Sequence, residues 1–129
     1  MDTASPYFKT KDLKIPPHSL EAEKALLGSI MIRGEAMHDI VDIVNEQSFY
    51  SNIHRMVWQA LLELHSKGSP IDILTLSARL KEKEQLEQVG GMSFLSELIN
   101  TVPSSTNANH YAEIVEKKHS MRELLRAAE

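Results

Sequence analysis

The chain has 129 residues, enough for one compact domain, and its 42% hydrophobic and 25% charged residues are typical of a soluble globular protein. It contains no cysteine, which excludes disulfide scaffolds, cysteine-ligated zinc and thiol nucleophiles. The formal net charge of -4 argues against a broad nucleic-acid-binding surface, and no apolar run is long enough for a membrane span or a signal peptide. We therefore expect a soluble, cytoplasmic domain.

The first segment, residues 1–18, is polar and aperiodic and reaches Pro16-Pro17 near its end, which predicts a flexible N-terminal arm. Helical periodicity begins at Ser19, a suitable N-cap, and the first helix should run to about Ile32. Gly28 within this helix predicts the close approach of a neighbouring helix. The residues that the helix should bury are Leu26, Leu27, Ile30 and Met31.

Two more helices are predicted before Gly68, which stands where a helix C-cap glycine belongs. The earlier one covers about residues 35–44 and buries Met37, Ile40, Val41 and Val44. A polar connector with Phe49 and Tyr50 leads to the later one, at about residues 52–67, which has the most regular apolar pattern and should lie at the centre of the core. Its apolar positions are Ile53, Met56, Val57, Trp58, Ala60, Leu61, Leu62 and Leu64.

The remaining helices are separated by clear turn signals. Asp72 is the expected N-cap of a fourth helix that turns Leu76 and Leu80 inward, and Gly90-Gly91 precedes a short fifth helix at about residues 92–100. After the turn at residues 103–105, a sixth helix begins near Asn107 and continues to the last residue without a capping signal. We therefore expect a chain cut from a longer protein.

The fold class that follows is all-α, because the β-branched residues lie inside 3.6-residue patterns and do not alternate. The predicted architecture is a compact orthogonal bundle of about six helices. Its domain organisation is an arm at residues 1–18, a helical head at residues 19–105, and the start of a long helix at residues 106–129.

No catalytic, cofactor-binding or metal site is expected. The five glycines allow neither a Walker A loop nor a dinucleotide-binding loop, and there is no nucleophile elbow. His18 is expected to make local hydrogen bonds at a helix start, and His54 and His65 to be structural or surface residues.

A metal site is the main alternative considered, because Glu-x-x-His occurs at Glu35–His38 and again at Glu116–His119. Two such motifs help to build di-iron sites in four-helix bundles. However, His38 points away from the apolar face of its helix, and the residues around His119 suggest an exposed position. Solvated charge pairs are therefore the preferred interpretation, and a small di-iron-like helical protein remains the alternative.

The last helix has mixed charge beside an apolar line, a pattern that favours helix–helix association over nucleic-acid binding. Lys118 and Arg122 lie on its charged side, interleaved with glutamates. The apolar line contains Tyr111, Ile114, Met121 and Leu125. We expect this helix to need a partner.

These landmarks together resemble the N-terminal domain of the bacterial replicative DNA helicase family, DnaB. The resemblance begins with Pro17-His18-Ser19-Leu20-Glu21-Ala22-Glu23 followed by Leu27-Gly28, and it extends over about residues 16–129. Further matches, in the family's order, are Phe49-Tyr50 with His54, Gly68-Ser69-Pro70-Ile71-Asp72, Gly90-Gly91 with Phe94-Leu95, Val102-Pro103-Ser104 with Asn107, and Tyr111-Ala112 with Ile114-Val115.

The resemblance implies a non-catalytic domain, with a helical head and the first arm of a helical hairpin. In the family, an ATPase motor domain that uses ATP and Mg²⁺ follows, and the N-terminal domains form a collar on a hexameric ring. The implied partners are further copies of the chain, the C-terminal domain of the primase DnaG at the replication fork, and a helicase loader. No direct nucleic-acid contact is expected here.

The resemblance also suggests where partners bind. Glu21 matches the first acidic residue of the family's opening motif, Phe94 the aromatic residue after the paired glycines, and Leu125 an aliphatic position on the hairpin arm. The full set of expected partner-binding residues is Glu21, Phe94, Tyr111, Ile114, Lys118, Met121, Arg122 and Leu125. A dimerisation module of another nucleic-acid protein is a further alternative.

Overall fold

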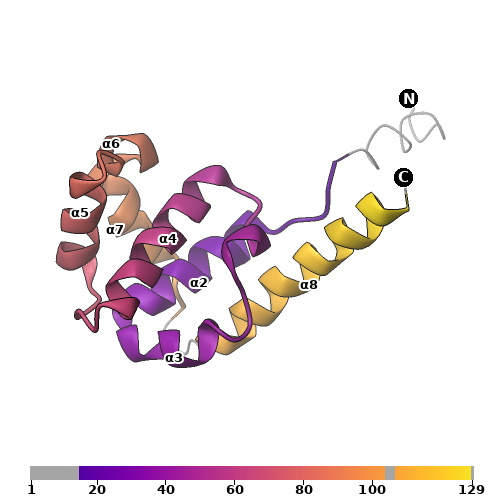
Figure 1. The fold of residues 1–129 in the computed structure, drawn as a ribbon, viewed down its shortest axis with the longest axis horizontal. Helices are drawn as coiled ribbons and strands as arrows, with labels where there is room; N and C mark the ends of the chain where they lie inside the picture. The colour runs from indigo at the N-terminus through magenta and orange to yellow at the C-terminus, as the bar shows by residue number, and fades with distance from the viewer. Residues whose placement is uncertain (1–14, 104–106, 129) are drawn as a thin grey trace.

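The computed structural model describes residues 15–103 and 107–128, and throughout these residues the fold is helical with no strand (Figure 1). The all-α prediction is confirmed. The elements in chain order are α2 (Leu20–Ile32), the 3-10 turn η1 (Gly34–Ala36), α3 (Met37–Ile40), the 3-10 turn η2 (Glu46–Ser48), α4 (Asn52–Ser66), α5 (Ile73–Glu82), α6 (Leu86–Val89), α7 (Gly91–Thr101) and α8 (Ala108–Ala127).

Side-chain caps explain where α2 and α5 begin. The Ser19 hydroxyl accepts the backbone N–H of Ala22 at the start of α2. At the start of α5, Asp72 and Thr75 form a reciprocal capping box. Each cap satisfies backbone donors that have no partner inside the helix. The predicted N-caps at Ser19 and Asp72 are therefore confirmed, as is the end of α4 at Gly68, whose φ is +70°.

The predicted helix at residues 35–44 is wrong as a continuous element. The chain forms η1 and a single turn of α-helix, α3, and then leaves helical geometry before η2. Met37, Ile40 and Val44 are nevertheless buried, because the broken segment wraps the same apolar face around the core. The burial of these residues was predicted, but the break in the helix was not.

Helix α6 was not predicted, and its boundaries explain why. Glu84, with φ of 59°, follows α5, and Gly90, with φ of 115°, ends α6. Both residues are left-handed, a conformation that interrupts a helix. The four residues of α6 are too few to show a helical period in sequence.

The core is centred on α2, which packs against α4, α7 and α8. Leu26, Leu27 and Ile30 are completely buried, as predicted. A Cβ atom at Gly28 would overlap the Leu98 carbonyl oxygen of α7 and lie 2.7 Å from Val102 Cγ2. The predicted close approach at this glycine is therefore confirmed.

Helix α4 also lies in the core, but its apolar face is narrower than predicted. Trp58 and Leu61 are buried. Ile53 and Leu62 are exposed, which corrects their assignment to the buried face. Leu62 lies at one edge of the apolar face, and Ile53 lies in the first turn of the helix; at neither position does a helical period alone decide burial.

Helix α8 runs along one side of the head and extends beyond it (Figure 1). Its first half buries Ala108, Ala112 and Val115, whereas its second half has no buried residue. It ends at Ala127 with Ala128 as its C-cap, and Glu129 and residues 1–14 lie outside the described residues. Within the described part of the chain, no helix is long and apolar enough to cross a membrane.

Candidate partner-binding site

Three of the residues expected to bind partners line one surface groove. Glu21, Tyr111 and Ile114 surround a cavity of about 430 Å³ between the start of α2 and the first half of α8. Tyr111 and Ile114 are half-buried and pack against the core, whereas Glu21 is exposed. The groove therefore combines apolar walls with an accessible carboxylate.

The outer half of α8 presents a separate apolar surface. Met121 and Leu125, both expected to bind partners, are 40% and 51% exposed. Leu124 is 72% exposed and was missed by the sequence analysis, although its spacing of three residues from Met121 places it on a neighbouring part of the helix surface. We call Met121, Leu124 and Leu125 the outer face of α8.

Arg122, also expected to bind partners, makes its contacts within the chain. Its guanidinium donates to the backbone carbonyls of Pro17 at 2.9 Å and of Ser48 at 2.8 Å, and lies 5.6 Å from the centre of the Tyr50 ring. Burial lowers the pKa of the Arg122 guanidinium, and the negative charge of Glu23 opposes this effect. Arg122 thus joins α8 to the segment before α2 and to the loop before α4.

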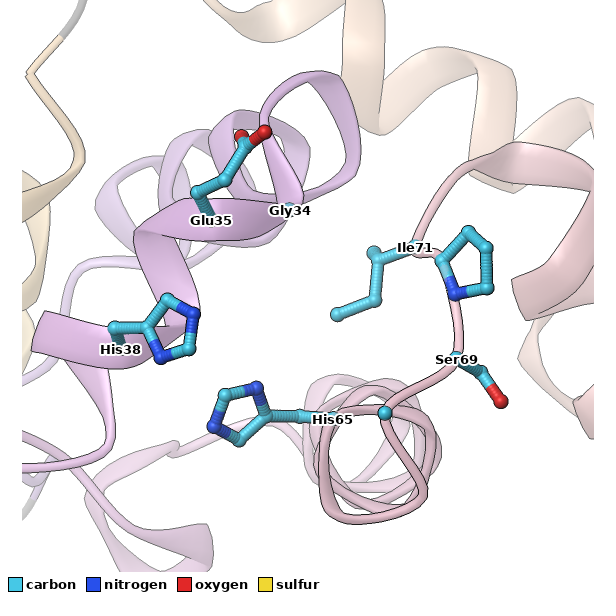
Figure 2. A pocket seen from close by; sticks show the side chains of 8 residues that line it. Gly34, Glu35, His38, His65, Ser69 and Ile71 are labelled. Carbon is cyan, nitrogen blue, oxygen red and sulfur yellow. The ribbon is translucent and has the colours of Figure 1, made fainter.

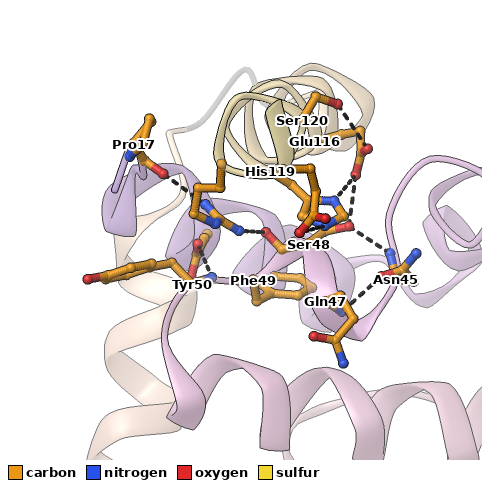
Figure 3. A network of polar contacts seen from close by, with 12 residues as sticks. Pro17, Asn45, Gln47, Ser48, Phe49, Tyr50, Glu116, His119 and Ser120 are labelled. Carbon is orange, nitrogen blue, oxygen red and sulfur yellow. Dashed lines mark hydrogen bonds and ion pairs between the residues drawn. The ribbon is translucent and has the colours of Figure 1, made fainter. Parts of the chain in front are cut away.

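A second part of this network was not predicted. The Ser48 hydroxyl donates to the carboxylate of Glu116 at 2.8 Å, and Nδ1 of His119 lies 3.2 Å from the same carboxylate (Figure 3). His119 is half-buried, which corrects its expected exposure. Lys118 is also half-buried, and it makes no hydrogen bond or ion pair with any residue that the structure describes.

Phe94, the remaining residue expected to bind partners, is not among the residues that line the groove. It is half-buried on α7, and its ring stacks on His54 with centroids 6.1 Å apart. His54 is itself buried, so it is structural, one of the two roles expected for it. The structure thus groups Glu21 with Tyr111 and Ile114 but leaves Phe94 outside that group.

Glu23 has a structural role that the sequence analysis did not predict. Its carboxylate is 2% exposed and accepts the backbone N–H groups of Tyr50 at 2.7 Å and Ser51 at 3.3 Å, while His54 Nδ1 lies 2.8 Å away. It therefore serves the start of α4 as well as its own helix dipole. The sequence signal was a glutamate on the apolar side of α2, beside Ala22 and Leu26.

His18 makes the local hydrogen bond expected of it. Its Nδ1 lies 2.7 Å from the carbonyl oxygen of Pro16, and its ring stacks on Tyr50 at a centroid distance of 4.0 Å. The stack holds the segment before α2 against the loop that Glu23 and Arg122 also bind.

The two Glu-x-x-His motifs do not assemble into one site. Glu116 and His119 form an ion pair on α8, and His38 instead contacts the ring of His65. Across the described residues, no group of three or more histidine, aspartate or glutamate side chains is arranged to hold a metal ion.

Comparison with known proteins shows what this arrangement is similar to. Residues 15–117 match the family model of the DnaB-like helicase N-terminal domain. The chain is 41% identical to the replicative DNA helicase DnaB of Geobacillus stearothermophilus over 115 residues, which are 89% of this chain and 25% of that protein. It is 36% identical to the replicative DNA helicase DnaC of Bacillus subtilis over the same shares. The chain therefore spans about a quarter of the length of these relatives.

Solved structures agree. The N-terminal domain of DnaB helicase from Mycobacterium tuberculosis superposes with a TM-score of 0.85 at 36% identity, covering 88% of this chain and 83% of that one. A DnaB-like replicative helicase, described with its interactions with primase, gives 0.75 at 27% identity and covers 85% of this chain and 26% of that one. The chain belongs to the family of DnaB-like helicase N-terminal domains.

Proposed function

We propose that this domain acts without catalysis of its own in assembling the collar of a hexameric replicative helicase and in docking primase. Family membership supports the proposal, as does the primase interaction described for a similar DnaB-like helicase. The observation that carries it is the outer face of α8, where Met121, Leu124 and Leu125 are exposed on a helix whose first half is packed against the head.

The outer face suits a helical partner. Three large apolar side chains on one turn of helix provide the kind of anchor that a partner helix buries. The groove at Glu21, Tyr111 and Ile114 lies along the first half of the same helix. A partner helix could therefore use the apolar outer face for affinity and the Glu21 carboxylate for a charged contact.

ATP hydrolysis and DNA unwinding belong, in this proposal, to other parts of the parent helicase. The sequence contains no Walker A loop, and its charge of -4 does not favour DNA. A helicase loader and a location at the cytoplasmic replication fork are proposed on the same family grounds. Measurable ATPase activity of these 129 residues would contradict the assignment.

The direct test is binding of the isolated C-terminal domain of primase, titrated by calorimetry against wild-type chain and Leu125→Glu. We expect the variant to weaken binding at least tenfold while its thermal melt stays unchanged, because Leu125 is 51% exposed. Leu74→Glu is the matched control, since Leu74 is an exposed leucine on α5. Equal loss in both variants, or a lowered melting temperature for Leu125→Glu, would contradict the role of the outer face.

Self-association distinguishes the alternative of a bare dimerisation module. Sedimentation of the wild-type chain should show oligomers that Leu125→Glu or Met121→Glu weakens, and the same preparation should bind the primase domain. Self-association without any primase binding would favour the dimerisation module over the proposed function.

A further inference from the structure

A pair of histidines outside the proposed docking surface faces a common cavity. His38 lies in α3 and His65 in the last turn of α4, and both line a cavity of about 340 Å³ together with Glu35 and the turn at residues 68–71. Their rings point toward one another (Figure 2), with centroids 5.1 Å apart and an interplanar angle of 74°. The two histidines are 27 positions apart in the sequence and come from different helices.

The ring nitrogens of His38 and His65 have no polar partner among the described residues. Neither His38 nor His65 makes a hydrogen bond or ion pair with any residue in the described part of the chain. In contrast, His18, His54 and His119 each have a polar partner for Nδ1. The lone pairs of His38 and His65 are thus open to a ligand from solution.

The spacing of the rings matches shared coordination. Two imidazoles on one tetrahedral Zn²⁺, with Zn–N bonds of about 2.0–2.1 Å, hold their ring centroids about 5 Å apart. The observed centroid separation of 5.1 Å agrees with this spacing. Imidazole is a preferred ligand of Zn²⁺, Ni²⁺ and Cu²⁺, whereas Mg²⁺ and Ca²⁺ prefer oxygen.

We propose that His38 and His65 form a two-histidine site for a divalent transition-metal ion. Glu35 lines the same cavity, but its carboxylate points away from the two rings in Figure 2. No closed set of three ligands exists among the described residues, so water completes the coordination and binding is reversible. The bound ion links α3 to the end of α4, which stabilises the folded chain by mass action.

The test is a thermal melt of the 129-residue chain with ZnCl₂ or NiCl₂ and with MgCl₂ as the reference. At a free Zn²⁺ concentration about five times the Kd, the melting temperature should rise by about 3–5 °C, and Mg²⁺ should have no such effect. Calorimetry should show one site per chain. No saturable Zn²⁺ binding, or an equal effect of Mg²⁺, would overturn the proposal.

Variants locate the site. His38→Asn and His65→Asn should each abolish the Zn²⁺-induced rise, whereas His110→Asn, an exposed histidine of α8 outside the cavity, should retain it. Persistence of the rise in either cavity variant would place the ion elsewhere and overturn the proposal. In the wild-type chain, NMR provides a reading that needs no variant: Zn²⁺ should shift the ring resonances of His38 and His65 before those of the other histidines, and the reverse order would overturn it.

Discussion

At the scale of single residues, Glu23 makes three polar contacts with the start of α4. Its buried carboxylate accepts two backbone N–H groups at the start of α4 and lies 2.8 Å from His54 Nδ1. Hydrogen bonds to a buried charged acceptor are stronger than neutral ones, and donors left without it would remain desolvated. Glu23 thereby positions the beginning of α4 against α2.

Glu23→Gln is therefore expected to be costly. Removing the charge weakens all three contacts, and we expect the free energy of unfolding to fall by roughly 2–4 kcal/mol. Urea denaturation followed by circular dichroism measures this. Glu21→Gln, two positions away and exposed, should change it by less than about 0.5 kcal/mol. Equal changes in the free energy of unfolding for the two substitutions would contradict a stabilising role of the buried Glu23 carboxylate.

The same residue shows what sequence reasoning cannot decide. A glutamate in the first turn of α2 fits the dipole of that helix, and this local explanation is sufficient on its own. The partners that matter are the backbone N–H groups of Tyr50 and Ser51, 27 and 28 residues away. Backbone donors carry no sequence signature, so only the three-dimensional arrangement reveals them.

At the scale of helices, the closest packing is between α2 and α7 at Gly28. An exposed helix normally gains about 1 kcal/mol when glycine is replaced by alanine. Here the added methyl group would collide with the Leu98 carbonyl and with the Val102 side chain. Because the Leu98 carbonyl belongs to the backbone of α7, it cannot easily move away. The requirement for contact between the two helices outweighs helix propensity.

Gly28→Ala should consequently destabilise the domain, by roughly 1–3 kcal/mol, as overpacking does. Ala78→Gly, on the exposed face of α5, is the control. There nothing crowds the methyl group, so the chain with alanine should have a free energy of unfolding about 1 kcal/mol higher than the chain with glycine. Thermal denaturation of both variants shows at each position whether alanine or glycine gives the more stable protein. Stabilisation by Gly28→Ala would mean that α7 moves aside at little cost.

Between α4 and α5, a cluster of charges links the helices on the surface. Burial acts to raise the pKa of the Glu63 carboxyl, but hydrogen bonds from Arg79 and Lys83 outweigh it and hold that pKa below its ordinary value of 4.5. Arg79 Nε is 2.9 Å and Lys83 Nζ 3.1 Å from the same carboxylate oxygen.

The sign of this shift predicts a pH dependence. A carboxyl with a lowered pKa in the folded state stabilises the protein above its unfolded pKa, and this contribution disappears as pH falls through the folded pKa. Wild type should therefore exceed Glu63→Gln in stability near neutral pH, and the difference should shrink below pH 4.5. Urea titrations across this range measure the difference. A stability difference that does not change with pH would contradict the stabilising role of the Glu63 contacts with Arg79 and Lys83. Glu113→Gln, at an exposed position, is the control.

At the scale of the whole molecule, α8 is held in two different ways. Its first half is buried in the core through Ala108, Ala112 and Val115. Its second half is fixed mainly by polar contacts, of which Arg122 provides those to Pro17 and Ser48. Since apolar burial is the stronger of these two forces, the outer part of α8 should be the first to separate from the head.

Arg122→Ala tests this division. Without the guanidinium, backbone amides in residues 117–127 and in the loop at residues 45–51 should exchange with solvent faster, while those of α2 and α4 should keep their protection. Hydrogen exchange with mass spectrometry reads both regions together. Arg126→Ala is the control, because Arg126 is exposed and pairs only with Glu123 among the described residues. Identical exchange rates in the two variants would contradict the conclusion that Arg122 holds the outer half of α8 against the head.

Across the molecule, the sequence predicted much of the fold but little of how its parts meet. Capping residues such as Ser19 and Asp72 and the apolar faces of the longer helices are local signals, and they located most elements correctly. The short turns around α3 and α6 depend on packing and left-handed residues, and they were missed. The grouping of Glu21 with Tyr111 required the complete fold, because 90 residues separate positions 21 and 111.

The bond between Arg122 and the Pro17 carbonyl has a geometric consequence. It brings together positions 105 residues apart, so the described residues just before Pro17 lie near the part of α8 around Arg122. Two fluorophores attached at Ile15 and Ala127 should therefore show efficient energy transfer while the outer half of α8 packs against the head. The efficiency should fall when the outer half of α8 separates from the head. A tag placed beside the outer face of α8 should interfere with the proposed docking, so affinity tags are better attached on α5.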